Sequence, residues 1–115
     1  MEERASRLPV KRWPSDKPIE AETVAREWAN KGFTCDLWID APGQEWIDFL
    51  HPVDEVVLVQ EGALEFEVEG AKALLGPFDE VFIPAGALHS MRNVGGTIAR
   101  WFYGYRLITG RRGYG

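Results

Sequence analysis

Short apolar stretches separated by turn residues make up the chain from residue 33 onward. The stretch 64–69 shows the pattern most clearly, because apolar residues alternate there with glutamates. Successive side chains of a β-strand point to opposite faces, so this alternation is typical of a half-buried strand. About eight short strands at regular spacing predict an antiparallel sandwich or barrel. The expected strands cover residues 33–39, 45–51, 55–60, 64–69, 72–75, 80–83, 87–92 and 98–107.

The segment before these strands has a different pattern. Residues 1–18 are polar, contain several prolines and show no period, so we expect an irregular N-terminal arm. Trp13 is the exception in this arm, and we expect it to dock on the barrel or on a partner subunit. Over residues 20–31 an apolar stripe recurs at helical spacing and stops before Gly32, which predicts a short helix.

The length of 115 residues limits the chain to a single domain. We expect this domain at residues 19–109, with the barrel over 33–107 and a C-terminal tail at 110–115. With 45% hydrophobic and 12% aromatic residues, the chain can bury a core and is unlike a disordered segment.

The net charge is -5, with 13 basic and 18 acidic residues, which argues against nucleic acid as a partner. The charges are unevenly spread, because residues 19–80 are acidic while the chain from Val81 onward has arginines and no acid. We interpret this as complementary strands of one sheet, with arginines beside acidic neighbours. A basic tail for an anionic partner would rest on Arg111 and Arg112 alone.

The sequence also bears on the compartment in which the protein works. Cys35 is the single cysteine, so no internal disulfide can form. The first eight residues contain no apolar run of the kind found in a signal peptide, and no stretch has the length of a transmembrane helix. We therefore expect a cytoplasmic protein without a membrane partner.

Strand alternation predicts which side chains face the barrel interior. Counting back from His51 places Phe49 and Ile47 on its face, whereas Trp38 and Trp46 are interpreted as packing residues. The interior becomes an apolar, aromatic cavity around a small polar cluster, which is typical of a small-molecule site. The residues predicted to line this ligand pocket are Phe49, Val57, Phe66, Met91, Trp101, Tyr103 and Tyr105.

The polar cluster contains the only two histidines of the chain, His51 and His89, together with Glu55. These residues stand at fixed distances from turn residues in two motifs. The first motif reads Gly43-x5-Phe49-x-His51-x3-Glu55-x6-Gly62, and the second reads Pro84-x-Gly86-x2-His89-x3-Asn93. Together they resemble the two motifs of the cupin superfamily, and they cover about half of the chain.

This resemblance implies an all-β fold, a cupin-type double-stranded β-helix or jelly-roll barrel. It also implies that His51, Glu55 and His89 bind a divalent transition metal (Fe, Mn, Ni or Zn). Two positions depart from the family pattern. Phe49 stands where the family has its first metal-binding histidine, and Phe78 stands where the second motif opens with glycine.

Two functions remain open at this point. The first is a metal-dependent enzyme, such as an oxygenase or an isomerase-like enzyme, that acts on a small organic ligand in the barrel. The alternative is a non-catalytic module that binds or senses a small molecule, with or without a metal. Whether the protein is an enzyme stays open, because beyond the three candidate ligands the predicted cavity offers only tyrosines for acid–base work.

We also expect a homodimer. Small single-domain proteins often gain stability by pairing, and the arm with Trp13 could reach a second barrel. The resemblance points the same way, because cupin barrels commonly pair face to face. The arm and the early strands are the predicted contact.

Overall fold

The computed structural model describes residues 8–108, which form two antiparallel β-sheets and one helix. One sheet has the strand order β1-β7-β4-β9-β2, and the other has the order β3-β8-β5-β6. The elements are β1 (Lys11–Arg12), α2 (Ala21–Asn30), β2 (Asp36–Asp40), β3 (Glu45–Phe49), β4 (Glu55–Glu61), β5 (Leu64–Val68), β6 (Ala71–Leu75), β7 (Asp79–Ile83), β8 (His89–Asn93) and β9 (Ala99–Tyr105).

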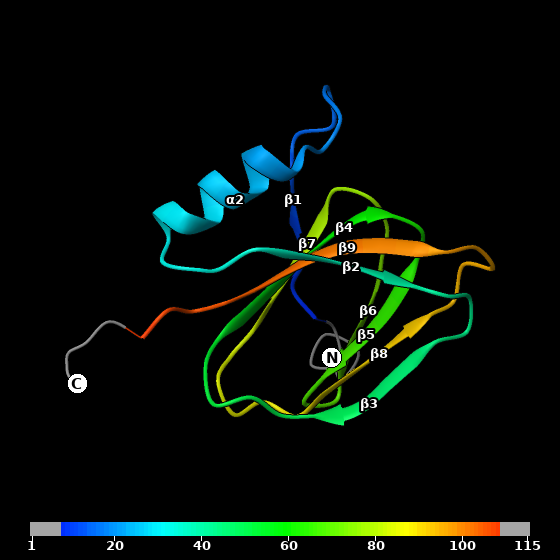
Figure 1. Ribbon diagram of the computed structural model, residues 1–115. Coiled ribbons are helices and arrows are strands. Elements are labelled where there is room, and N and C mark those ends of the chain that lie inside the picture. The colour runs from blue at the N-terminus through cyan, green and yellow to red at the C-terminus, as the bar shows by residue number, and fades with distance from the viewer. Residues whose placement is uncertain (1–7, 109–115) are drawn as a thin grey trace.

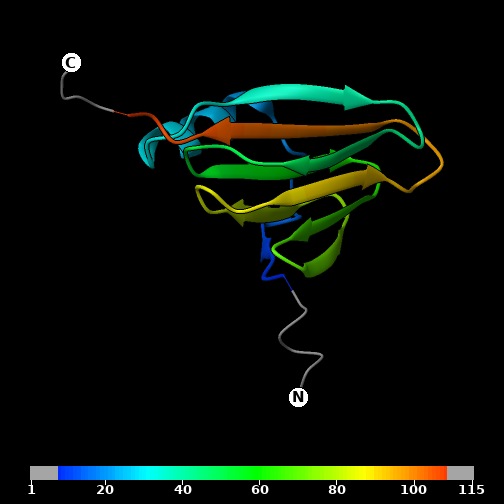
Figure 2. The ribbon, with the colours of Figure 1, turned by 90° about the horizontal axis from the view of Figure 1, so that it is seen from below.

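The two sheets face each other, as Figures 1 and 2 show, and α2 lies on the outer side of the sheet that contains β4 and β9. This arrangement confirms the predicted all-β jelly-roll barrel with a short N-terminal helix. The predicted helix at 20–31 is observed at Ala21–Asn30. The predicted tail at 110–115, with Arg111 and Arg112, lies outside the described residues. The domain boundaries therefore stay a prediction.

The main core fills the space between the sheets. In β5 the predicted alternation holds, because Leu64, Phe66 and Val68 are buried while Glu65 and Glu67 are only partly covered. The buried members of this core are Val57, Val59, Leu64, Phe66, Val68, Leu75, Val81, Ile83, Ala87, Met91, Ala99 and Trp101.

β4 is apolar on both faces because both faces are covered. Val57 and Val59 belong to the core between the sheets, whereas Val56 and Leu58 belong to a second cluster with Trp28 of α2. A strand buried on two sides reads as a continuous apolar run rather than an alternating one. The valine-rich sequence of β4 therefore places it at the centre of the molecule.

The arm is less irregular than its sequence suggests. Lys11 and Arg12 form β1, which pairs with β7 and so adds a strand to the larger sheet. Trp13 follows directly, and its indole Nε1 donates a hydrogen bond to Glu80 of β7 at 2.8 Å. Trp13 thus docks on its own barrel, one of the two positions predicted for it.

Strand β3 contains a β-bulge that the sequence analysis did not predict. Trp46 pairs with Met91 and Phe49 pairs with His89, so two residues of β3 lie opposite one residue of β8. Asp48 lies in the bulge with a φ of 58°, in the left-handed region that aspartate tolerates better than most residues. An extra residue of this kind re-aims the side chains that follow it.

The bulge overturns the predicted face of Ile47. Alternation counted back from His51 placed Ile47 in the cavity, but its side chain is 44% exposed, and Trp46 lines the cavity instead. The strand also ends at Phe49, so His51 lies in the loop that leads to β4. Counting by two fails here because the bulge inserts one residue between Trp46 and Phe49.

The late arginines lie beside acidic residues, as the charge distribution predicted. Arg92 contacts Glu45 and Glu65 across the sheet, each at 3.0 Å, and Arg106 contacts Asp54 at 2.9 Å. Most of these side chains are partly exposed, so each pair adds little to stability. Within residues 8–108, no helix combines the length and the apolar character needed to cross a membrane.

Candidate metal centre and ligand pocket

Two segments distant in sequence bring His51, Glu55 and His89 together. His51 lies in the loop before β4, Glu55 begins β4 and His89 begins β8. Each residue offers one potential ligand atom, and these atoms all lie within 4.8 Å of one another. Glu55 and His89 are buried, while His51 is partly accessible from the cavity. The two sheets thus gather the two imidazoles and one carboxylate that the sequence predicted as a cluster.

Hydrogen bonds between two loops hold the cluster in place. Gly86 N–H donates to the carbonyl oxygen of His51 at 2.8 Å, and Ala85 N–H donates to Asp54 Oδ1 at 2.8 Å. Gly86 has a φ of 79°, which a glycine adopts without strain. The turn between Pro84 and Ala87 is therefore fixed against the loop that carries His51. The motif glycine serves the site through backbone geometry rather than by contact with a ligand.

The ring of His89 has a fixed orientation. Its Nδ1 lies 3.0 Å from the carbonyl oxygen of Ala87, which can only accept a hydrogen bond. Nδ1 therefore carries the proton, and Nε2 is left free to point at Glu55. A second hydrogen bond of this kind is the usual way in which a protein orients a metal-binding histidine.

The surroundings of Glu55 Oε1 indicate whether a metal fits this site. It lies 3.5 Å from Nε2 of His51 and 3.5 Å from Nε2 of His89, and it is buried without a hydrogen-bond partner among the described residues. A buried acceptor without a partner is costly. A cation between the three atoms would satisfy it, and two imidazoles with one carboxylate suit a first-row transition metal. The residues present fit the group that the resemblance implies.

Protonation equilibria in the cluster follow from burial and from the charge of Glu55. Burial alone would lower the pKa of His89, but the adjacent Glu55 carboxylate and the Ala87 carbonyl outweigh it and raise that pKa. Burial, with a contribution from Glu55, raises the pKa of Tyr105 to about 12. Tyr105 is therefore a neutral phenol at physiological pH, and its hydroxyl lies 3.5 Å from Nε2 of His51.

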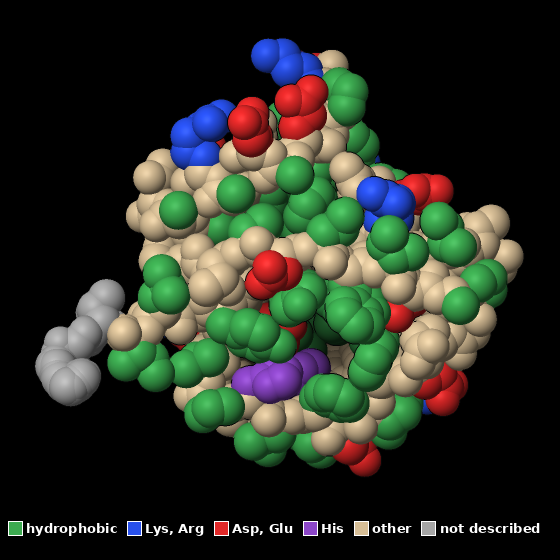
Figure 3. Space-filling model, viewed as in Figure 1, with side chains coloured by type: hydrophobic (Ala, Val, Ile, Leu, Met, Phe, Trp, Pro, Cys, Tyr) green, Lys and Arg blue, Asp and Glu red, His purple; other side chains and the backbone are tan. Residues whose placement is uncertain are grey.

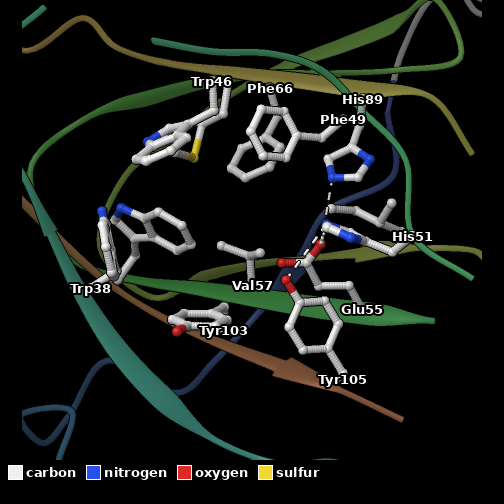
Figure 4. Close-up of a pocket in the computed structure, with 13 residues that line it drawn as sticks. Trp38, Trp46, Phe49, His51, Glu55, Val57, Phe66, His89, Tyr103 and Tyr105 are labelled. Atoms are coloured by element: carbon white, nitrogen blue, oxygen red, sulfur yellow. Dashed lines mark hydrogen bonds and ion pairs between the residues drawn. The ribbon is translucent and has the colours of Figure 1, made fainter. Parts of the chain in front are cut away.

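A pocket of about 200 Å³ opens beside the cluster. Figure 3 shows the histidines at the bottom of an opening whose rim is mostly hydrophobic, and Figure 4 shows aromatic rings around a central space. The structure places all seven residues of the predicted ligand pocket in this lining. The full lining is Trp38, Trp46, Phe49, His51, Glu55, Val57, Phe66, Ile83, His89, Met91, Trp101, Tyr103 and Tyr105.

Trp38, Trp46 and Ile83 also line the pocket and were not predicted to do so. Trp38 pairs directly with Trp101 across β2 and β9, and directly opposed residues share a face of the sheet. Pairing the first expected strand with the last would have identified Trp38. Trp46 could not be identified by counting, because the bulge in β3 reverses its face.

The sequence of residues 36–105 matches the Cupin domain family. This chain belongs to the cupin family. The match covers both motifs and all strands from β2 to β9. The resemblance drawn from the motif residues is thus confirmed, although the role of each ligand and pocket residue stays a prediction.

Solved structures agree with this assignment. The chain is 32% identical to TT1209 from Thermus thermophilus, with a TM-score of 0.59, over 64% of this chain and 72% of that one. An RmlC-like cupin from Shewanella frigidimarina is 20% identical, with a TM-score of 0.59, over 65% of this chain and 66% of that one. No match was found among curated protein sequences.

A further similar structure is that of an enzyme. The polyketide cyclase RemF from Streptomyces resistomycificus is 21% identical, with a TM-score of 0.57, over 64% of this chain and 54% of that one. At this level of identity the likeness shows the fold alone, because one fold carries many chemistries.

Proposed function

We propose that this cupin binds one divalent transition metal through His51, Glu55 and His89, and a small organic ligand in the adjoining pocket. The observation that carries the proposal is Glu55 Oε1, a buried acceptor without a partner among the described residues, equidistant from two imidazole nitrogens. Both imidazole nitrogens lie 3.5 Å from this oxygen, which is beyond the usual length of a hydrogen bond. A cation bound to all three side chains would offset the free-energy cost of burying this oxygen.

The bound metal would supply Lewis-acid chemistry or, if it is iron, dioxygen chemistry. The protein's own contribution is to orient and enclose the ligand. The apolar walls exclude water from the ligand, and Phe49 places a ring where many cupins have a fourth ligand. Tyr105, kept neutral by its raised pKa, offers a hydroxyl donor beside His51. We infer an enzyme that works on one small organic substrate, with Tyr105 as the residue that orients it.

A second candidate is a module that binds its ligand without turnover. It is favoured by the chemistry of the lining, in which the described residues other than the three candidate ligands are aromatic or aliphatic. General acid–base catalysis needs a titratable group near the operating pH, and the two tyrosines titrate well above it. Both candidates use the same pocket, and the second works with or without the metal.

Elemental analysis of protein purified without an affinity tag tests the proposal. We expect about one transition metal per chain, because the site offers one set of three ligands. Glu55→Gln removes the anionic ligand and should weaken metal affinity by more than about tenfold. Glu67→Gln, on the outer face of β5, is the matched control and should leave metal affinity unchanged. Protein that takes up no iron, manganese, nickel or zinc after dialysis would contradict the proposal.

A further inference from the structure

One buried carboxylate holds three tryptophans of the pocket in place. Asp40 of β2 is 3% exposed, and the indole N–H groups of Trp38, Trp46 and Trp101 all donate to it. The distances are 2.8 Å from Trp38, 3.2 Å from Trp46 and 3.1 Å from Trp101. Both oxygens of Asp40 accept, which is the pattern of a carboxylate. All three indole donors are therefore occupied within the protein.

These hydrogen bonds decide which part of each indole the cavity meets. In Figure 4 the nitrogens of Trp38 and Trp46 point away from the central space, so their carbon surfaces form its wall. The wall continues through Tyr103, whose ring centroid lies 5.6 Å from that of Trp101. We call Trp38, Trp46, Trp101 and Tyr103 the aromatic cage. It occupies the end of the pocket away from His51 and Glu55.

The aromatic cage favours positive charge. Aromatic faces carry negative electrostatic potential, and an indole that donates to a carboxylate gains electron density in its ring. The buried carboxylate of Asp40 accepts hydrogen bonds from the three indoles of the cage, and none of the described lining residues is Lys or Arg. An anionic or strongly polar group would find no indole donor at the cage end, since the indole N–H groups are already bonded.

The cage also selects among cations. A primary or secondary ammonium carries N–H donors that need acceptors when buried, and the carbon surfaces of the indoles offer none. A fully alkylated cation has no such donors, and aromatic cages are a known means of holding quaternary ammonium groups. A quaternary ammonium or a tertiary sulfonium therefore matches both the charge preference of the aromatic faces and the carbon surfaces that the three indoles present.

We propose that the aromatic cage binds the alkylated onium head of a small organic ligand whose other end faces His51, Glu55 and His89. This inference names the ligand class for the pocket and rests on the proposed small-molecule function. Asp40 acts as a positioning residue, because it fixes the three indoles without touching the ligand.

Titration calorimetry with a pair of isosteric compounds, one cationic and one uncharged, tests the inference. Choline and 3,3-dimethyl-1-butanol have the same shape and differ only in the charge of the head group. We expect choline to bind wild-type protein about tenfold more tightly than the alcohol, because only the cation gains from the aromatic faces. Equal binding, tighter binding of the alcohol, or no binding of choline at millimolar concentration would overturn the proposal.

Variants of Trp38, which is 41% exposed at the pocket rim, assign the preference to the cage. Trp38→Leu should reduce the choline preference to about threefold or less, whereas Trp38→Phe keeps a π face and should retain most of it. Leu37→Ala is the matched control, because Leu37 is 40% exposed on the same strand and faces away from the pocket. An unchanged preference in folded Trp38→Leu would also overturn the proposal.

The same titrations on metal-loaded and chelator-treated protein separate this inference from the proposed metal site. Choline carries no strong metal-binding group, so its preference over the alcohol should persist without metal. Metal uptake without a choline preference would remove the cage proposal alone. A choline preference in protein that binds no metal would support the cage proposal and remove only the metal site.

Discussion

Phe49 replaces a histidine of the cupin motif, and its surroundings show what this replacement does. Its ring centroid lies 6.3 Å from that of His51 and 6.4 Å from that of His89, and its edge packs against Trp46. The side chain is 39% exposed, so it borders the cluster from the open side of the pocket. An apolar ring at this place leaves three candidate ligands and keeps the approach to them free of a third imidazole.

Restoring the histidine should strengthen metal binding. We expect Phe49→His to raise metal affinity by about tenfold or more, because a further imidazole can reach the ion from the bordering position. Competition with a chromogenic chelator measures the effect. Phe49→Leu is the control, since it offers no ligand atom and should leave affinity near that of the wild type. Unchanged affinity in folded Phe49→His would mean that residue 49 does not reach the ion.

At the scale of elements, the packing of α2 on the larger sheet depends on a glycine in β9. Gly104 lies under Trp28 and beside the backbone of Thr34, where the chain leaves the helix. A Cβ at this position would overlap with the carbonyl oxygen of Thr34 and would lie 2.9 Å from Cε3 of Trp28. The helix and the strand approach this closely only because residue 104 has no side chain.

Gly104→Ala should therefore destabilise the fold. We expect the free energy of unfolding to fall by about 1–3 kcal/mol, because backbone and a buried indole must move apart to admit the methyl group. Gly76→Ala is the matched control, since an added Cβ there meets nothing within 4 Å, and its effect should stay within about 1 kcal/mol. Urea denaturation of both variants measures the difference. Similar free energies for the two would show that the helix adjusts without strain.

At the scale of the whole molecule, the early strands present apolar side chains at an open sheet edge. β2 is the last strand of its sheet, and Leu37 and Ile39 are 40% and 49% exposed on it. β3 is the edge of the other sheet, where Ile47 is 44% exposed. Unpaired edges with apolar side chains are prone to pair with another chain. Trp13 of the arm docks on its own barrel. We therefore propose that β2 and β3, rather than the arm, form the contact of a homodimer.

We expect the full chain to sediment as a dimer at micromolar concentration. Ile39→Glu should shift it toward the monomer, because a charge at the edge of β2 opposes association. Leu74→Glu is the matched control, since Leu74 is 67% exposed on β6, which lies in the other sheet at the edge opposite β3, and should leave the dimer intact. A wild-type monomer at this concentration would contradict the proposal, as would loss of the dimer in both variants.

The sequence by itself determined the features that depend on local pattern. Alternation placed Phe66 and Val68 in the core, and the count along β9 placed Trp101 and Tyr103 on the inner face. The spacing of the two motifs identified the family and singled out His51, Glu55 and His89. The inferences about core and family are confirmed because a regular strand alternates its faces whatever it pairs with, and because each motif keeps its turn residues at fixed offsets. The ligand role of the three residues stays a prediction.

Only the tertiary structure decided which additional residues enter the site. Trp46 replaces Ile47 in the lining because the β3 bulge is defined by pairing with β8, more than 40 residues away (Asp48 N–H to Ser90 Oγ spans 42). Asp40 gathers three indoles from three strands, including Trp101 at a separation of 61 residues. No local pattern records such partners, because they meet only when the two sheets close on each other.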